Sequence, residues 1–294
     1  MNLRIFAITF YFFSAVSLYA QLGGGVKIGL NFSNIKGPSE LGLQDVKLEQ
    51  TDNYTGFMIG PSFAYSFTDN FGLRGEFLYS KKGMKYSYDG PSSRIFVTDG
   101  DLTEISTIGT SKINYTVNHT CMDIPLMAFA RYKKFEVSGG FYASLLFSRV
   151  ADGIMEYKWT NTDGSNGVIN PLLQYNYTRD KFGEGDNAQT ETAFFNDFQT
   201  VKSTIPKTFG AYYDNKEDLG NKYNFLDYGV SVGASFFLNQ SLFIGGRLQY
   251  GLADLTRTKA DVSISQKSPD SLYILRDDKD RNYTIQVFVG FSLR

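Results

Sequence analysis

The chain has 294 residues, which is enough for one large β domain or two ordinary domains. Its 29 basic and 30 acidic side chains nearly cancel, so the charge gives no argument for nucleic acid or for an acidic partner. A single cysteine and a single histidine can form neither an internal disulfide nor a zinc site. The 20 tyrosines, 26 phenylalanines and 29 glycines favour strands joined by tight turns.

The first twenty residues have the features of an export signal. Arg4 supplies a short positive start, an apolar run follows over residues 5–16, and the small residue Ala20 precedes Gln21. An anchoring helix is the alternative, but this run is shorter than the ~20 apolar residues that a spanning helix needs. We expect a signal peptide over residues 1–20, cleaved near Ala20–Gln21, and a mature domain over 21–294.

The segment FEVSGGFYASLLF, residues 135–147, introduces the pattern of the whole chain. Every second residue from Phe135 to Phe147 is apolar, aromatic or glycine, whereas those between are mostly small or polar. This alternation predicts a β-strand with two different faces. The same period recurs in seven further segments, which are residues 25–35, 57–67, 71–80, 121–132, 227–238, 242–252 and 283–293.

The connections between these segments alternate between short and long. Tight turns at 68–70, 133–134 and 239–240 separate long connections at about 36–54, 88–112, 150–226 and 256–282. An up-and-down barrel produces this order when all short turns lie at one end. The predicted fold is therefore all-β, an eight-stranded antiparallel up-and-down transmembrane β-barrel with long extracellular loops, the longest being an insertion over 150–226.

The polar face of the predicted strands carries charges of both signs in mid-strand. These residues are Arg74, Glu76, Asp123, Glu136, Asp227 and Arg247. Opposite charges can pair inside a narrow barrel, and eight strands leave room only for side chains. Aromatic residues near the strand ends resemble the girdles of membrane barrels. We therefore expect the apolar face to contact lipid and the six charges to form a structural network in the lumen, with an ion or proton path as the alternative.

A soluble periplasmic ligand-binding barrel of the lipocalin type is a second interpretation of the same alternation. Period two alone does not say which face points outward, and such a barrel would place the apolar face inside. The charges of both signs on the polar face favour the membrane barrel.

Four segments carry a family resemblance. They resemble the first, third, fourth and seventh strands of the PorT-like outer-membrane β-barrel domain proteins of Bacteroidota-type bacteria. In this order they are GVKIGLNFSNI, FGLRGEFLYSKKG, MDIPLM and RLQYGLADL. The resemblance covers all eight strands, from about Gly23 to Arg294. The chain departs from the family by ending on Arg294 instead of an aromatic residue, and by its longer 150–226 loop. The resemblance implies an integral outer-membrane protein. Strand motifs do not carry over the namesake's role in assisting protein secretion.

His119 and Cys121 are the residues that a catalytic hypothesis would use. Two positions apart on one strand, they share a face at about 7 Å between Cα atoms. No serine-containing elbow accompanies them, so we expect no catalysis and keep an outer-membrane enzyme acting on lipid as the alternative.

The sequence has no phosphate loop, dinucleotide fingerprint or metal-ligand cluster, and we expect no cofactor. The DDKDR segment, 277–281, is interpreted as a solvated loop, since a calcium site needs better-spaced oxygens.

Residues 186–203, DNAQTETAFFNDFQTVKS, form the most distinctive part of the long loop. Asp186 as N-cap and Gln189 three residues later predict a helix that carries Phe194, Phe195 and Phe198 on one stripe. These three residues are a candidate partner contact, and the alternative is a helix that packs on its own loop.

Together these features predict a non-enzymatic protein of the bacterial outer membrane. The expected roles are surface interaction, envelope integrity or PorT-like support of protein secretion. The expected partners are outer-membrane lipid and envelope or secretion proteins reached through the loops, with no nucleic acid.

Overall fold

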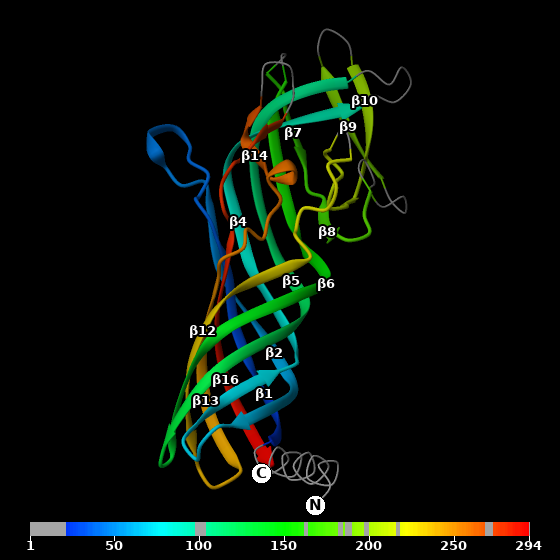
Figure 1. Ribbon diagram of the computed structural model, residues 1–294. Helices are drawn as coiled ribbons and strands as arrows, with labels where there is room; N and C mark the ends of the chain where they lie inside the picture. The colour runs from blue at the N-terminus through cyan, green and yellow to red at the C-terminus, as the bar shows by residue number, and fades with distance from the viewer. Residues whose placement is uncertain are drawn as a thin grey trace, which may run out of the picture.

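The structure is a computed structural model that describes residues 22–97, 104–161, 164–181, 185, 190–196, 200–215, 218–267 and 273–293. The predicted signal peptide and its cleavage position lie outside these ranges. A slender barrel stands at one end of the molecule, and a second body of strands, which we call the head, stands at the other (Figure 1). Within the described residues, no helix has the length and apolar composition that a membrane-spanning helix needs.

Nine strands build the wall of the barrel. They are β1 Leu22–Lys36, β2 Glu49–Ser66, β3 Phe71–Glu76, β4 Leu78–Val97, β5 Glu104–Tyr132, β6 Phe135–Thr160, β12 Leu226–Phe237, β13 Leu242–Gly251 and β16 Arg281–Leu293. β3 and β4 form one wall position, because both pair with β2 and β5 and only Phe77 separates them. The wall is therefore a ring of eight antiparallel positions, as predicted.

Pairing between the first and last strands closes the ring. β1 pairs with β16 over thirteen consecutive positions, from Gly24↔Leu293 to Lys36↔Arg281. The short turns and the C-terminal end of β16 lie at the end of the barrel away from the head (Figure 1). This arrangement agrees with the predicted alternation of short and long connections.

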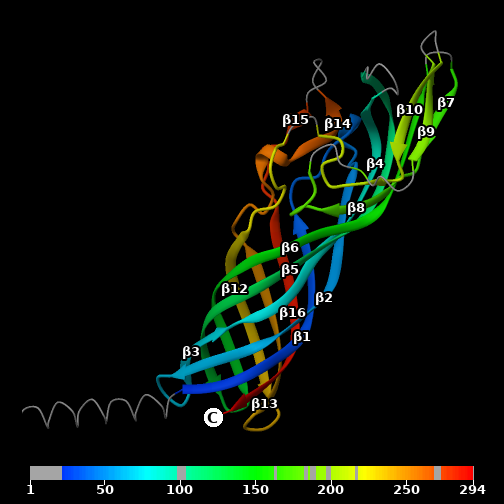
Figure 2. The ribbon, with the colours of Figure 1, turned by 90° about the vertical axis from the view of Figure 1, so that its right-hand side faces the viewer.

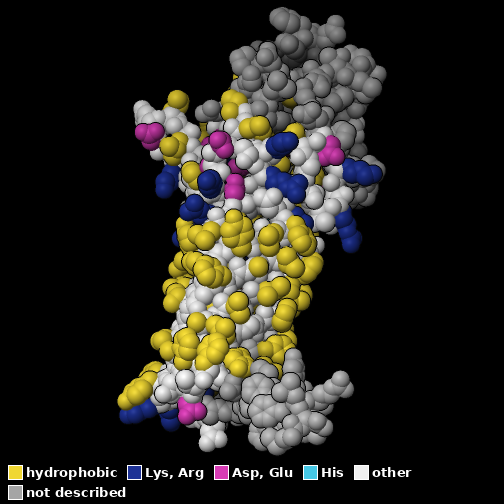
Figure 3. Space-filling model, in the orientation of Figure 1, with side chains coloured by type: hydrophobic (Ala, Val, Ile, Leu, Met, Phe, Trp, Pro, Cys, Tyr) yellow, Lys and Arg dark blue, Asp and Glu magenta, His cyan; other side chains and the backbone are white. Residues whose placement is uncertain are grey.

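The apolar face of the strands points outward, as predicted. Val26, Ile28, Phe141 and Val232 are each more than half exposed on the barrel wall, while the alternate residues of the same strands are buried. Exposed apolar side chains form a continuous belt around the visible face of the barrel (Figure 3). A ligand-binding barrel would need this face inside, so the lipocalin-type interpretation is wrong.

A β-bulge in β6 reverses the direction of its side chains. Thr120 pairs with Ser148 and Cys121 with Leu146, which leaves Phe147 without a partner in β5. Below the bulge the odd-numbered residues face outward, but above it the odd-numbered Arg149 and Ala151 are buried. One extra residue moves every following side chain to the other face. The period-two pattern of residues 135–147 could not be extended beyond Phe147 for this reason.

Three strands continue beyond the barrel and form the frame of the head. β4, β5 and β6 have 20, 29 and 26 residues, whereas about 9–11 residues are enough to cross a bilayer. Two of the predicted long connections are therefore partly strand. β4 and β5 continue through most of 88–112, and β6 continues to Thr160 in the predicted 150–226 loop. Alternation persists in these extensions. In the barrel the inward side chains are polar, but in the head the buried side chains are largely aromatic, so polarity does not identify the inward face there.

Shorter elements complete the head on this frame. They are β7 Asn166–Ile169, β8 Leu172–Asn176, β9 Thr190–Asn196, β10 Thr200–Pro206, β11 Thr208–Phe209, β14 Val262–Lys267 and β15 Tyr273–Leu275, with the 3-10 turns η1 Leu43–Asp45 and η2 Thr258–Ala260. β14 and β15 lie on one side of the head, and β7, β9 and β10 lie on the other (Figures 1 and 2).

The outward position of Val232 in the middle of β12 gives a test of this fold. A Val232→Arg substitution should lower the free energy of unfolding in a lipid bilayer by about 2–4 kcal/mol, because the charge would enter the hydrocarbon. Urea titration of the refolded barrel in vesicles measures this loss, with Val232→Leu as the control. An unchanged unfolding midpoint for the arginine variant would contradict the lipid-facing position.

Candidate functional site

The six predicted lumen charges are all buried inside the barrel. The most exposed of them, Arg74, has 7% of its surface accessible. Glu76 forms ion pairs with Lys27 and Arg247, and both of its carboxylate oxygens lie within 2.8 Å of the Arg247 guanidinium. Three strands, β1, β3 and β13, thereby meet across the lumen through one carboxylate.

A second carboxylate, Glu136, forms ion pairs with two arginines. Arg74 donates to it at 2.5 and 3.0 Å, and Arg131 donates to it at 2.7 Å. The Arg131 guanidinium also lies 3.7 Å from the centre of the Phe237 ring. Rings and ion pairs together fill the lower lumen.

The third group surrounds Asp123. Lys82 forms an ion pair with it at 2.8 Å, and the Ser144 hydroxyl donates to it at 2.5 Å. Asp227 accepts hydrogen bonds from the Tyr142 hydroxyl at 3.0 Å and the Asn282 amide at 3.1 Å. The structure thus distributes the six residues among separate ion-pair and hydrogen-bond groups.

Three basic partners of these carboxylates were missing from the predicted network. Lys27 and Arg131 lie on faces that the alternation marks as polar, so their positions could have identified them. Lys82 follows the end of the predicted 71–80 strand, and only the continuation of β4 turns it into the lumen.

His119 and Cys121 are both buried. The His119 ring is 3% exposed and makes an edge contact with the Tyr223 ring at 4.7 Å between centroids. The Cys121 thiol instead donates to the Ser80 carbonyl at 3.4 Å and lies 3.7 Å from an Asp123 oxygen. The two groups therefore have different neighbours.

The helix predicted over 186–203 is wrong. Residues 190–196 and 200–206 are the antiparallel strands β9 and β10, in which Phe195 pairs with Val201 and Phe194 with Lys202. β-Branched and aromatic residues in both halves favour strands once a pairing partner is available. Asp186, Gln189 and Phe198 lie outside the described residues, so the partner-contact hypothesis for the three phenylalanines stays a prediction.

A cavity of about 230 Å³ lies in the head, above the barrel. Its wall carries seven tyrosines from four parts of the chain, which are Tyr86, Tyr115, Tyr175, Tyr177, Tyr212, Tyr213 and Tyr223. Five of them form a continuous series of ring contacts with centroid distances between 4.7 and 5.8 Å. The phenol has an apolar ring and a polar hydroxyl, so the residue suits a wall that is packed on one side and open on the other.

Ion pairs between distant segments hold this wall together. Arg94 of β4 forms an ion pair with Asp214 at 2.6 Å, and Arg276 contacts Glu49 of β2 at 2.9 Å. Glu49 also accepts the Tyr86 hydroxyl at 2.7 Å. No local motif joins these residues, which is why sequence reasoning missed the cavity.

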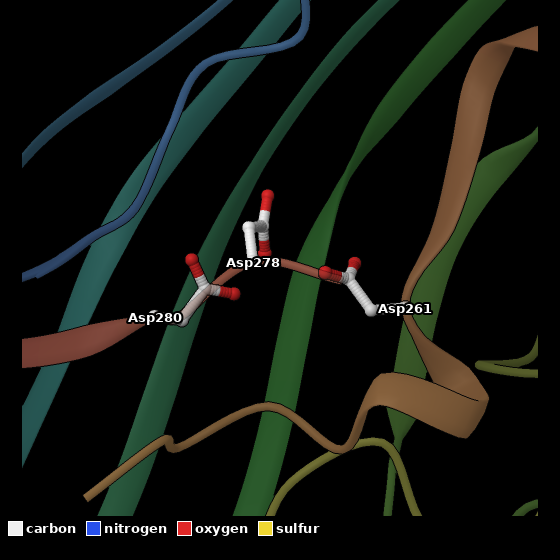
Figure 4. A group of neighbouring side chains, drawn as sticks. All are labelled: Asp261, Asp278 and Asp280. Atoms are coloured by element: carbon white, nitrogen blue, oxygen red, sulfur yellow. The ribbon is translucent and has the colours of Figure 1, made fainter. Parts of the chain in front are cut away.

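Three carboxylates meet at one side of the cavity. Asp261, Asp278 and Asp280 point toward one another (Figure 4). Each offers one carboxylate oxygen, and these three oxygens lie within 4.8 Å of one another. Burial raises the pKa of Asp261 from 3.8 to about 7; Lys222 opposes this effect, and Asp280 and Asp278 reinforce it. The cluster has the donor chemistry for a cation, although Asp278 already pairs with Arg276 at 2.8 Å. The sequence interpretation of DDKDR as a solvated loop did not include this cluster, because Asp261 comes from another part of the loop.

Glu76 gives a test of the lumen network. A Glu76→Ala substitution should cost about 3–5 kcal/mol of unfolding free energy, because it leaves Lys27 and Arg247 buried without their carboxylate. Denaturant titration of the refolded barrel measures the loss. Glu156→Ala is the matched control, since the Glu156–Lys158 pair is exposed and should contribute at most about 1 kcal/mol. Equal small losses would contradict the structural role.

Asp261 gives a test by pH. The folded chain holds a proton on Asp261 between about pH 4 and 7 that the unfolded chain has released, so this group lowers the unfolding free energy as the pH rises through that window. Asp261→Asn should reduce the drop in thermal midpoint between pH 5 and pH 8. Circular dichroism in detergent measures it, with the exposed Asp152→Asn as control. The same drop in the Asp261 variant and the wild type would refute the assignment.

Comparison with known proteins agrees with this architecture. The model of the outer membrane protein beta-barrel domain matches residues 19–257. No curated protein matches the chain. The attachment invasion locus protein Ail of Yersinia pestis, solved with the heparin analogue sucrose octasulfate, is 11% identical, with 93% of this chain and 99% of that chain covered and a TM-score of 0.35. OprG of Pseudomonas aeruginosa is 11% identical, with 92% and 96% covered and a TM-score of 0.28.

TM-scores this low carry no argument, so the assignment depends on the family match and on the closed ring of strands. The PorT-like subdivision stays a prediction. Because the match covers well over half of the chain, the protein belongs to the outer membrane protein beta-barrel domain family and is a β-barrel protein of the bacterial outer membrane.

Proposed function

We propose that this protein has a non-enzymatic role at the cell surface and that the head performs it. The observation that carries the proposal is the tyrosine-lined cavity of about 230 Å³, which is built on the continuations of strands that also form the barrel. Binding sites on such rigid elements are preorganised, because their side chains are ordered before a partner arrives.

The size and lining of the cavity suggest what it accepts. Its volume is below the about 300–1,000 Å³ of sites for drug-sized ligands, so it suits one projecting group of a larger partner. The aromatic walls suit the apolar face of that group, and the charged side chains suit its hydroxyl or amine substituents. Surface interaction is therefore favoured over envelope integrity or support of secretion, which do not need a preformed cavity.

The filled lumen and the separate surroundings of His119 support the absence of transport and of catalysis. The Glu76, Glu136 and Asp123 groups occupy the interior with paired charges. A nucleophile and its base need to lie within hydrogen-bond reach, and Cys121 has other partners.

The proposal requires the head to lie outside the cell. A protease site with an epitope tag inserted after Gly164, which lies between β6 and β7, should be cleaved on intact cells, because β7 lies in the part of the head away from the barrel (Figure 2). The same insertion between Lys133 and Lys134 is the control, since that turn lies at the opposite end of the barrel. Immunoblotting after protease treatment measures both.

Two results would contradict the proposal. The first is a tag after Gly164 that survives on intact cells while the tag at Lys133 is lost. The second is a change in lipid A or phospholipid composition, measured by mass spectrometry, in cells carrying His119→Ala, which would favour the outer-membrane enzyme instead.

A further inference from the structure

Two cations lie directly opposite one another on the outer surface of the barrel. Lys36 at the end of β1 pairs across the strands with Arg281 at the start of β16. Like charges in directly opposed positions of an antiparallel pair destabilise it. Among the residues that the structure describes, neither side chain takes part in an ion pair. Within the described part of the chain, no carboxylate therefore lies at ion-pair distance from either cation.

Aromatic rings beneath the two cations hold them against the barrel wall. The Lys36 Nζ lies 5.0 Å from the centre of the Tyr283 ring. The Arg281 guanidinium lies 5.9 Å from the centre of the Tyr250 ring and donates to the Tyr250 hydroxyl at 2.9 Å. Tyr250 and Tyr283 are themselves opposite each other on β13 and β16. Two charges and two rings thus form one cluster over three adjacent strands.

The cluster lies at the edge of the apolar belt that faces the head. On β1 the outward residues that lead down from Lys36 include exposed Leu30 and Ile28, and on β16 those that lead down from Arg281 include exposed Ile285 and Val287. Lysine and arginine side chains gather directly above the belt (Figure 3). Lipid headgroups occupy this level when the belt spans the hydrocarbon.

We propose that Lys36 and Arg281 bind a phosphate group of an outer-leaflet lipid headgroup, with Tyr250 and Tyr283 packing against the lipid below it. A phosphate placed at the pair accepts charge-assisted hydrogen bonds from both cations and removes their repulsion. The aromatic rings supply the apolar surface that a lipid has and a free phosphate ion lacks. The site is separate from the head cavity and does not depend on what the cavity binds, but its place in the outer leaflet rests on the proposed position of the head outside the cell.

The test compares three probes on the full-length protein in detergent. They are lipid A, dephosphorylated lipid A and inorganic phosphate, and native mass spectrometry measures the amount bound. Lipid A should bind, and dephosphorylated lipid A should bind about tenfold less, as expected when hydrogen bonds to a charged group are lost. Millimolar inorganic phosphate should not displace lipid A.

Variants assign the binding to the pair. Lys36→Gln/Arg281→Gln should weaken lipid A binding about tenfold or more. Lys36→Gln alone keeps the Arg281–Tyr250 hydrogen bond and should also weaken lipid A binding. This single variant tests the site if the double variant does not fold. Lys133→Gln/Lys134→Gln is the matched control. Its lysines also lie over aromatic rings, Tyr132 and Phe236, but at the opposite edge of the belt, so binding should be unchanged.

Four outcomes would overturn the proposal. Equal binding of phosphorylated and dephosphorylated lipid A would exclude recognition of phosphate. Displacement by inorganic phosphate would make the site one for a free ion. Unchanged binding in a folded Lys36→Gln variant, or an equal loss in the control, would place the phosphate elsewhere.

Discussion

The pairing of β1 with β16 is the constraint on which the rest of the structure depends. Inside a bilayer no water is present to bond with a free amide or carbonyl, so a sheet can cross it only when its last edge is closed. The thirteen paired positions between Gly24 and Lys36 of β1 and their partners in β16 achieve this closure. Because β1 and β16 are the first and last of the described strands, the barrel closes only when strands that are far apart in the sequence have come together.

Closure with eight strands leaves a narrow interior, and the composition of the inward face follows from that. Charged side chains can enter such a space only if they are paired or hydrogen-bonded. Among the described residues, Glu76, Glu136 and Asp123 each have a cation at hydrogen-bond distance, and Asp227 accepts hydrogen bonds from Tyr142 and Asn282. The resulting cross-links join strands that are not neighbours, such as β3 and β13 through Glu76 and Arg247. A filled interior leaves the two ends and the outer wall as the surfaces available to a partner.

The aromatic residues serve two different surroundings. On the barrel wall, rings such as Tyr283 and Tyr250 mark the level where hydrocarbon gives way to headgroups, and cations lie over them. In the head the rings turn inward and pack on one another, and the hydroxyl of Tyr86 finds the Glu49 carboxylate. The bulge at Phe147 lies between these two regions in β6 and exchanges the inner and outer faces.

The sequence by itself determined the eight wall positions, the outward direction of the apolar face and the burial of the six charges. The strands follow from a period of two within single segments such as Phe135–Phe147. The outward direction of the apolar face and the burial of the charges follow from the charges of both signs that the polar faces of several segments carry. Only the tertiary structure decided the partners of those charges, the hairpin β9–β10 in place of a helix, and the cavity in the head. Those features join residues far apart in the chain, such as Glu49 with Arg276 and Asp261 with Asp278, and a local pattern contains no information about contacts at that separation.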